Sequence, residues 1–131
     1  MLEFGSAKSN AISLTFYHSE GDLSVAMQDG IIILSTYPDE KTAVKISKKI
    51  VQSKLAACVS LTKVRSFYWW QNKVEDSQEC LAIYKSVKGT DKELKKAIAK
   101  SHPYKVPEIV ELKMSSVSKS YLDWMVESVT I

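Results

Sequence analysis

The sequence predicts an α+β fold: a ferredoxin-like α/β sandwich with an antiparallel sheet, helices on one face and an extra C-terminal helix. From residue 30 onward the apolar patterns follow the order strand, helix, strand, strand, helix, strand, helix. The two middle strands form one long run, residues 55–86, that is interrupted only at Gln71 and Asn72. Split βαβ connectivity with right-handed crossovers then gives a four-stranded sheet with two helices on the same face.

Size and composition agree with a single-domain soluble protein. The chain has 131 residues, of which 45% are hydrophobic and 25% charged. It has no apolar run of the roughly 20 residues that a membrane span needs, and its start lacks the basic-then-apolar pattern of a secretory signal. We therefore expect a cytoplasmic protein with no membrane partner.

Residues 1–29 are predicted to be an N-terminal extension to a domain that spans residues 30–131. The first six residues, MLEFGS, resemble a cloning-vector remnant. The segment before Gly30 has one lysine against four acidic residues, and its run Ala11 to Tyr17 could add a strand to a sheet edge. We expect this extension to be accessory and mobile.

The first strand and helix of the domain follow directly. The apolar run Gly30 to Thr36 predicts a central strand that is buried on both faces. Pro38 then opens a helix that extends to about Lys54. The apolar residues at helical spacing that form its predicted inward stripe are Ala43, Val44, Ile46, Ile50 and Val51, and the acidic residues of its first turn are Asp39 and Glu40.

The hairpin of residues 55–86 organises the rest of the chain. With Gln71-Asn72 as a two-residue loop, the numbers of opposed residues sum to 143. This register places Trp69 across from Val74, Leu61 from Ala82, Val59 from Tyr84, Cys58 from Lys85 and Cys80 from Lys63. The two cysteines then point to opposite faces, so we predict free thiols rather than a disulfide.

Both faces of this hairpin are apolar. One face resembles a core, and the other also carries apolar side chains: Cys58, Val64, Tyr68, Trp70, Leu81 and Ile83. An exposed antiparallel face usually alternates with polar residues, and helices of the same chain can cover only one face. We expect another copy of the chain to cover the second face, so the hairpin predicts an oligomer. The aromatic residues 68–70 are interpreted as interface packing rather than as a stacking platform.

The remaining elements are a helix, a strand and a last helix. Thr90 to Glu93 has the capping-box pattern, the buried face of the helix is predicted from Leu94, Ala97 and Ile98, and Pro103 stops it. Residues 108–114 alternate as a strand. Ser118 or Ser120 then caps a last helix whose apolar residues lie at helical spacing: Leu122, Met125, Val126 and Val129.

The charge of the domain is positive. From Gly30 onward the chain has 17 basic and 11 acidic residues, a net of +6. Many of the lysines lie on the two predicted helices, where solvated faces normally carry such charge. We therefore favour solubility over nucleic-acid binding as the role of this charge.

Several motifs in the right order resemble the CutA divalent-cation-tolerance family. They span residues 31–124 and comprise TYPDE, KLAAC at 54–58, FYWWQNKVE at 67–75, Glu79, Lys85, HPYKVPEIVEL at 102–112 and YLDW at 121–124. The resemblance implies a homotrimer of ferredoxin-like subunits whose long hairpins extend between neighbours. It also implies an association with tolerance of copper and other divalent metals, with no required cofactor.

The resemblance also implies candidate ligands. Copper-linked bacterial members have a cysteine at the end of the first strand and a His-His pair before Pro-Tyr. The matching positions here are Ser35, Ser101 and His102, so His102 is the one candidate metal ligand and a weak site for copper.

A second set of residues matches polar family positions that line a cleft between subunits: Glu79, Lys85, His102 and Tyr104, with Cys58 from KLAAC. Their groups suit a small anionic or metal-chelated ligand. Beside a ligand site, a purely structural interpretation stays open for each part of this set. Glu79 and Lys85 could form an ordinary ion pair, and His102 could cap the end of a helix.

The sequence is compatible with three functional classes, which it favours unequally. The first is a non-enzymatic trimeric metal-tolerance protein, with a PII-like signalling trimer that binds small anions as an alternative by analogy of fold. The second is an RNA-binding module, which is disfavoured because the aromatic residues cluster at the hairpin tip. The third is an enzyme, which is disfavoured because the chain offers no Gly-rich phosphate loop and has only two histidines.

Overall fold

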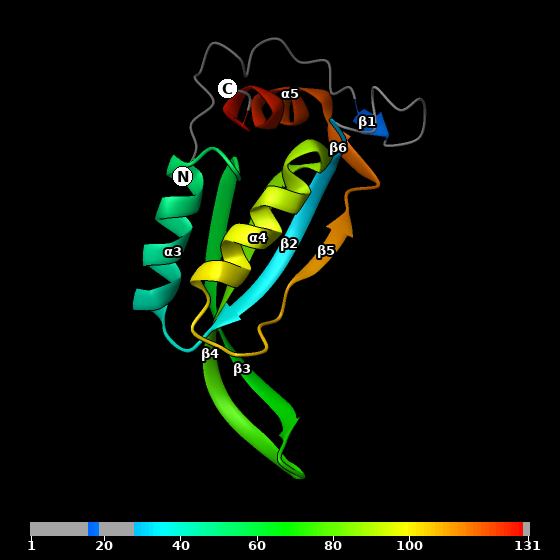
Figure 1. Cartoon of the computed structure of the whole chain (residues 1–131). Coiled ribbons are helices and arrows are strands. Elements are labelled where there is room, and N and C mark those ends of the chain that lie inside the picture. The colour runs from blue at the N-terminus through cyan, green and yellow to red at the C-terminus, as the bar shows by residue number, and fades with distance from the viewer. Residues whose placement is uncertain (1–15, 19–27, 130–131) are drawn as a thin grey trace.

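The computed structural model describes residues 16–18 and 28–129 (Figure 1). In chain order its elements are β1 (Phe16–His18), β2 (Gly30–Tyr37), α3 (Glu40–Gln52), β3 (Cys58–Trp70), β4 (Lys73–Val87), the 3₁₀ turn η1 (Lys88–Thr90), α4 (Asp91–Ser101), β5 (Val110–Lys113), β6 (Ser116–Ser118) and α5 (Lys119–Val129). Four antiparallel strands form a sheet in the order β3-β4-β2-β5, and α3 and α4 lie together on one face (Figure 1). This arrangement is the predicted sandwich topology. The vector-like first six residues and residues 11–15 lie outside the described part of the chain.

The predicted hairpin is confirmed in its register. β3 and β4 pair from Cys58 opposite Lys85 to Trp70 opposite Lys73. Gln71 and Asn72 have φ angles of 47° and 63°, the left-handed conformation that a type I′ turn needs at both central positions. β2 runs beside β4 only as far as the pair Tyr37 and Cys80. Beyond that pair, residues 64–79 project from the body (Figure 1), and we call them the hairpin arm.

The main core lies between the sheet and the helices α3 and α4. Among its fully buried side chains are Ile33, Leu94 and Ile98, together with Tyr37 and Tyr84. The hydroxyl groups of the two tyrosines hydrogen-bond each other, as buried polar groups normally do. Burial raises the pKa of both phenols, so both keep their protons. The prediction of free cysteines is confirmed for Cys58 and Cys80.

The inward face of α3 differs in part from the prediction, because Val44 is only partly buried and Val51 is exposed. Asp39 caps the helix, and its carboxylate accepts a hydrogen bond of 2.7 Å from the backbone N–H of Thr42. The buried residues are Ala43, Ile46, Ser47 and Ile50, whereas Val51 is 39% exposed. The prediction for Val51 is therefore wrong. Helical periodicity brings residue 47 into line with residues 43 and 50, so the small Ser47 takes the inward position.

The capping box predicted at Thr90 is also wrong. α4 begins at Asp91, and the Thr90 side chain makes no capping hydrogen bond. Because η1 precedes the helix, the Thr90 hydroxyl faces inward and lies 3.0 Å from the Val87 carbonyl oxygen and 2.7 Å from Ser86 Oγ. Pro103 follows the end of α4 at Ser101, as predicted.

A second buried cluster lies under α5. Its buried members are Val87, Leu122, Met125 and Val129, which confirms the predicted apolar spacing of the last helix. α5 begins at Lys119, directly after Ser118, one of the two predicted caps. β6 pairs with β1 in a separate two-stranded sheet, so Phe16–His18 does not join the edge of the main sheet. None of the helices in the described part of the chain is long and apolar enough to cross a lipid bilayer.

The face of the sheet opposite α3 and α4 is covered by α5 at its Val87 end and is otherwise open and partly apolar. The strand β5 is shorter than the strand predicted at residues 108–114 and covers only Val110–Lys113. Val110 and Leu112 are 44% and 47% exposed on the open face. Glu111, between them, points to the helix side and forms an ion pair of 2.8 Å with Lys95 of α4.

Candidate functional site

The five predicted site residues fall into two groups at different places on the hairpin. Glu79 lies at the root of the hairpin arm with Tyr104 and His102, whereas Lys85 and Cys58 form a cross-strand pair at the other end. Glu79 and Lys85 face the same side of β4 but are six residues apart, about 20 Å at the rise of a strand. One chain therefore does not bring all five residues together.

The first group is fastened by a hydrogen bond between Tyr104 and Glu79. The Tyr104 hydroxyl donates to Glu79 Oε2 at 2.8 Å. Tyr104 lies in the loop between α4 and β5, and Glu79 lies one residue beyond the last pair that β4 makes with β2. Burial raises the pKa of the Tyr104 phenol, and the Glu79 carboxylate raises it further, so the phenol remains a hydrogen-bond donor.

His102 is held at both ring nitrogens. Nδ1 accepts a hydrogen bond of 3.1 Å from the backbone N–H of Tyr104, so Nε2 carries the proton and donates to the Thr36 carbonyl at 2.9 Å. The ring also stacks on Tyr37, with 4.5 Å between centroids and 15° between planes. Burial lowers the pKa of His102, against the opposing effects of the Thr36 hydrogen bond and the Glu79 charge. The neutral imidazole of His102, the residue that follows the last turn of α4, therefore has a structural role. Metal binding would require the loss of one of its two hydrogen bonds.

The positions linked to copper do not form a metal centre within the chain. Ser35 is fully buried in the core, and Ser101 is exposed on α4, where its hydroxyl donates to the Ala97 carbonyl at 2.7 Å. The described residues contain no group of three or more His, Cys, Asp or Glu side chains that could hold a metal ion.

The second group surrounds Lys85. Its Nζ donates to Ser60 Oγ at 3.4 Å, and Ser60 Oγ lies 4.0 Å from the Cys58 thiol. α5 adds Tyr121, whose pKa is raised by burial and by the neighbouring Cys58. Sequence reasoning missed Ser60 and Tyr121. The hairpin register could have found Ser60, which is the diagonal neighbour of Lys85, but no sequence signal places α5 beside β3.

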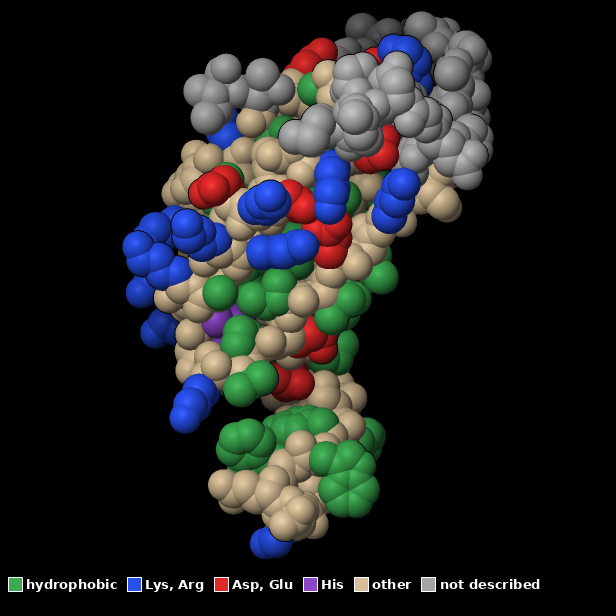
Figure 2. All heavy atoms as spheres, turned by 45° about the vertical axis from the view of Figure 1, so that its right-hand side comes forward, with side chains coloured by type: hydrophobic (Ala, Val, Ile, Leu, Met, Phe, Trp, Pro, Cys, Tyr) green, Lys and Arg blue, Asp and Glu red, His purple; other side chains and the backbone are tan. Residues whose placement is uncertain are grey.

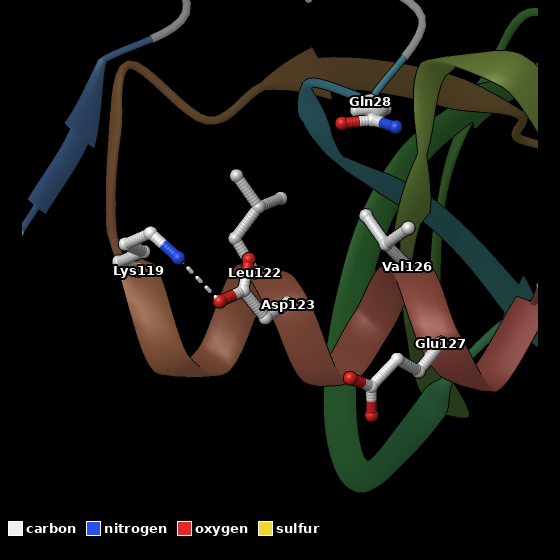
Figure 3. A pocket seen from close by; sticks show the side chains of 6 residues that line it. All are labelled: Gln28, Lys119, Leu122, Asp123, Val126 and Glu127. Atoms are coloured by element: carbon white, nitrogen blue, oxygen red, sulfur yellow. Dashed lines mark hydrogen bonds and ion pairs between the residues drawn. The ribbon is translucent and has the colours of Figure 1, made fainter.

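A shallow pocket of about 350 Å³ lies between Gln28 and α5 (Figure 3). The residues that line it are Gln28, Lys119, Leu122, Asp123, Val126 and Glu127. Lys119 and Asp123 form an ion pair of 2.7 Å there, so these two charges already satisfy each other. The pocket contains none of the predicted site residues.

The fold defines a class of small α+β proteins in which a four-stranded antiparallel sheet carries a hairpin that extends beyond the neighbouring strand. Within this class, the model of the family described as CutA1 divalent ion tolerance protein matches residues 31–128, and the chain belongs to this family.

Individual relatives agree with this assignment. The divalent-cation tolerance protein CutA of Pyrococcus horikoshii is 39% identical over 97 residues, which are 74% of this chain and 95% of that protein. The structure of CutA from Synechococcus elongatus matches with a TM-score of 0.79 and 27% identity, over 88% of this chain and 96% of the other. The structure from Archaeoglobus fulgidus is described as a periplasmic divalent cation tolerance protein CutA. It matches with a TM-score of 0.75 and 32% identity, over 77% of this chain and 99% of the other.

Proposed function

We propose that the chain acts as a non-enzymatic homotrimer in the tolerance of divalent metal ions such as copper, with ligands bound in clefts between the subunits. The observation that carries this proposal is the exposure of the hairpin arm. In the single chain Trp69 is 76% exposed, Phe67 64%, Val74 59% and Trp70 55%. Figure 2 shows these hydrophobic side chains gathered on the arm, below the body of the molecule. Such a contiguous apolar surface usually marks an association site.

The arm and the open face of the sheet offer two separate apolar surfaces for assembly. The arm projects beyond β2, so the helices of its own chain do not cover it. When the arm of one copy contacts a different surface of the next, the contact is heterologous, and such contacts form a ring where the rotation between copies closes. The family resemblance of the sequence implies three copies.

Assembly would also bring together candidate ligand residues that lie far apart in the single chain. Glu79 and Lys85 lie about 20 Å apart in one chain, and neighbouring copies are the means to bring such groups together. Any metal binding would be weak, because His102 offers one imidazole whose two nitrogens already have partners. We place the function in the cytoplasm, with no membrane or nucleic-acid partner, as the sequence predicts.

Native mass spectrometry tests the assembly and the metal together. The expected spectrum shows three copies per particle, and weak addition of Cu(II) or Zn(II) in numbers that match the three clefts. Trp69→Ser combined with Trp70→Ser should shift the particles toward single chains. Val51→Ser is the matched control, because it removes an exposed apolar side chain from α3, outside the arm. A single-chain wild type would refute the trimer, and a trimer that takes up no metal at high micromolar concentration would refute the metal part.

One observation favours the alternative, a PII-like trimer that binds small anions. Lys85 is a half-buried cation on the open face, with no carboxylate partner among the described residues. A positive charge of this kind attracts an anion and repels a metal cation.

A further inference from the structure

The surroundings of Lys85 indicate which kind of ligand a site on the open face of the sheet would bind. On the open face of the sheet Lys85 stands between Cys58 of β3 and Ile32 of β2, and Ile32 in turn pairs with Leu112 of β5. Its neighbours on the β2 and β5 side are thus apolar. In the described part of the chain its ammonium has a hydrogen bond to Ser60 Oγ, which is long at 3.4 Å, and no carboxylate within ion-pair distance.

Lys88, which is nearby in the sequence, differs from Lys85 because it has two acidic partners. Lys88 is exposed, yet its Nζ lies 2.7 Å from Asp91 and 2.9 Å from Glu111. Lys85 is less exposed and has neither kind of contact among the described residues. A lysine that is removed from water is normally paired, because the unpaired charge is costly to bury.

The groups around Lys85 are of one chemical kind. An ammonium has three donors, of which one is directed to Ser60. Ser60 contributes a hydroxyl, and beside it the Cys58 thiol and the Tyr121 phenol hydrogen-bond each other. Burial raises the pKa of that phenol, so it stays protonated. A cation beside O–H and S–H groups, with no carboxylate in ion-pair range among the residues that the structure describes, matches the acceptor oxygens of an anion.

We propose that Lys85, Ser60, Cys58 and Tyr121 form a binding site for a small, diffusible oxyanion of the phosphate or carboxylate type. The site lies on the open face of the sheet, beside α5. This anion site rests on the proposed function. In the proposed trimer a neighbouring copy covers this face and removes water from Lys85, so the charge of Lys85 needs a counter-ion.

Calorimetric titration with inorganic phosphate, at constant ionic strength, tests the site. Lys85→Met keeps the length of the side chain and removes its charge, and should weaken phosphate binding by about tenfold to a hundredfold. Ser60→Ala should weaken it by about threefold to tenfold. Lys85→Arg keeps the charge and should retain binding. Lys113→Met is the matched control, because Lys113 is an exposed strand lysine outside the site, and this variant should bind as the wild type does.

The mass of the particles, measured on the same samples, separates the two proposals. A trimer that binds no phosphate, or that binds it equally well with Lys85→Met, overturns the anion site and leaves the assembly standing. A trimer that takes no phosphate but is loosened by Lys85→Met would show that a carboxylate of a neighbouring copy fills the position, and would also overturn the site. A wild type that is a single chain overturns the assembly. Where Lys85→Met fails to fold, Ser60→Ala decides: phosphate binding weakened by about threefold to tenfold supports the site, and unchanged binding overturns it.

Discussion

The hydroxyl group of Tyr104 donates a hydrogen bond of 2.8 Å to the carboxylate of Glu79. This contact joins the loop after α4 to the root of the hairpin arm, although the two residues lie 25 positions apart in the sequence. The same loop is held by the backbone N–H of Tyr104, which donates to His102 Nδ1. The loop therefore acts as a brace between the body and the arm.

We expect Tyr104→Phe to lower the free energy of unfolding by about 1–2 kcal/mol, because a half-buried carboxylate loses its donor. Urea unfolding at a fixed protein concentration measures this loss. Ser101→Ala is the control, because the Ser101 hydroxyl donates to the Ala97 carbonyl at 2.7 Å on the exposed end of α4, outside the arm. The control should change stability by less than about 0.5 kcal/mol. Equal losses in the two variants would contradict the brace.

The pH dependence of stability should reveal the neutral His102. Burial lowers the pKa of His102 in the folded chain below its ordinary value of 6.5. Above pH 6.5 the stabilisation by the neutral ring is fully present, and it is lost as the pH falls through 6.5 toward the folded pKa, because the unfolded chain binds the proton first.

His102→Asn keeps an acceptor for the Tyr104 N–H but cannot titrate. We expect this variant to be less stable than the wild type at pH 7.5 and to come closer to it at pH 5. An NMR titration of the wild-type imidazole should give a pKa below 6.5. A pKa above 6.5 would contradict the burial of a neutral imidazole at this position.

The two buried tyrosines should be energetically coupled. Tyr84→Phe leaves the Tyr37 hydroxyl in the core without this partner, which should cost about 1–3 kcal/mol, and Tyr37→Phe should cost a similar amount. The double variant removes both hydroxyls, so its loss should be smaller than the sum of the two by about 1 kcal/mol or more. A double-mutant cycle in urea measures this difference. Additive losses would show that the hydrogen bond between the tyrosines contributes nothing of its own.

Glu111 should stabilise the contact between β5 and α4. Its side chain is 19% exposed and lies 2.8 Å from Lys95 and 2.9 Å from Lys88. Burial alone would raise the pKa of Glu111, but the two lysines outweigh it and lower the pKa, so the stabilisation is present above pH 4.5 and is lost as the pH falls through the folded pKa.

Glu111→Gln should therefore cost about 1–3 kcal/mol at pH 7 and clearly less at pH 3. Glu108→Gln, at an exposed position of the same segment, should cost less than about 0.5 kcal/mol at both pH values. Thermal or urea unfolding at the two pH values checks both. A loss from Glu111→Gln that does not change with pH would rule out the two lysines as its cause.

The sequence predicted the hairpin correctly because its signals are local. Period-2 alternation and two residues that tolerate positive φ were sufficient to set the register of β3 and β4. The apolar spacing of α5 was equally clear. By contrast, Thr90 was misassigned because the capping-box pattern does not reveal that a 3₁₀ turn precedes the helix and turns the hydroxyl inward.

The candidate site was harder to predict because it depends on contacts between distant segments. The sequence singled out His102, but only the structure shows that both of its nitrogens bond the backbone. Glu79 and Lys85 were grouped by resemblance, and strand geometry separates them within one chain. Tyr121 was missed because nothing in its local sequence shows that α5 lies beside Cys58.

The central claim is that the hairpin arm is buried between copies of the chain. Sedimentation velocity of the full chain at low micromolar concentration tests this most directly. We predict one boundary at about three times the chain mass of 14.7 kDa, which Trp69→Ser with Trp70→Ser shifts toward lower mass. A stable, folded species with the mass of a single chain would contradict the account.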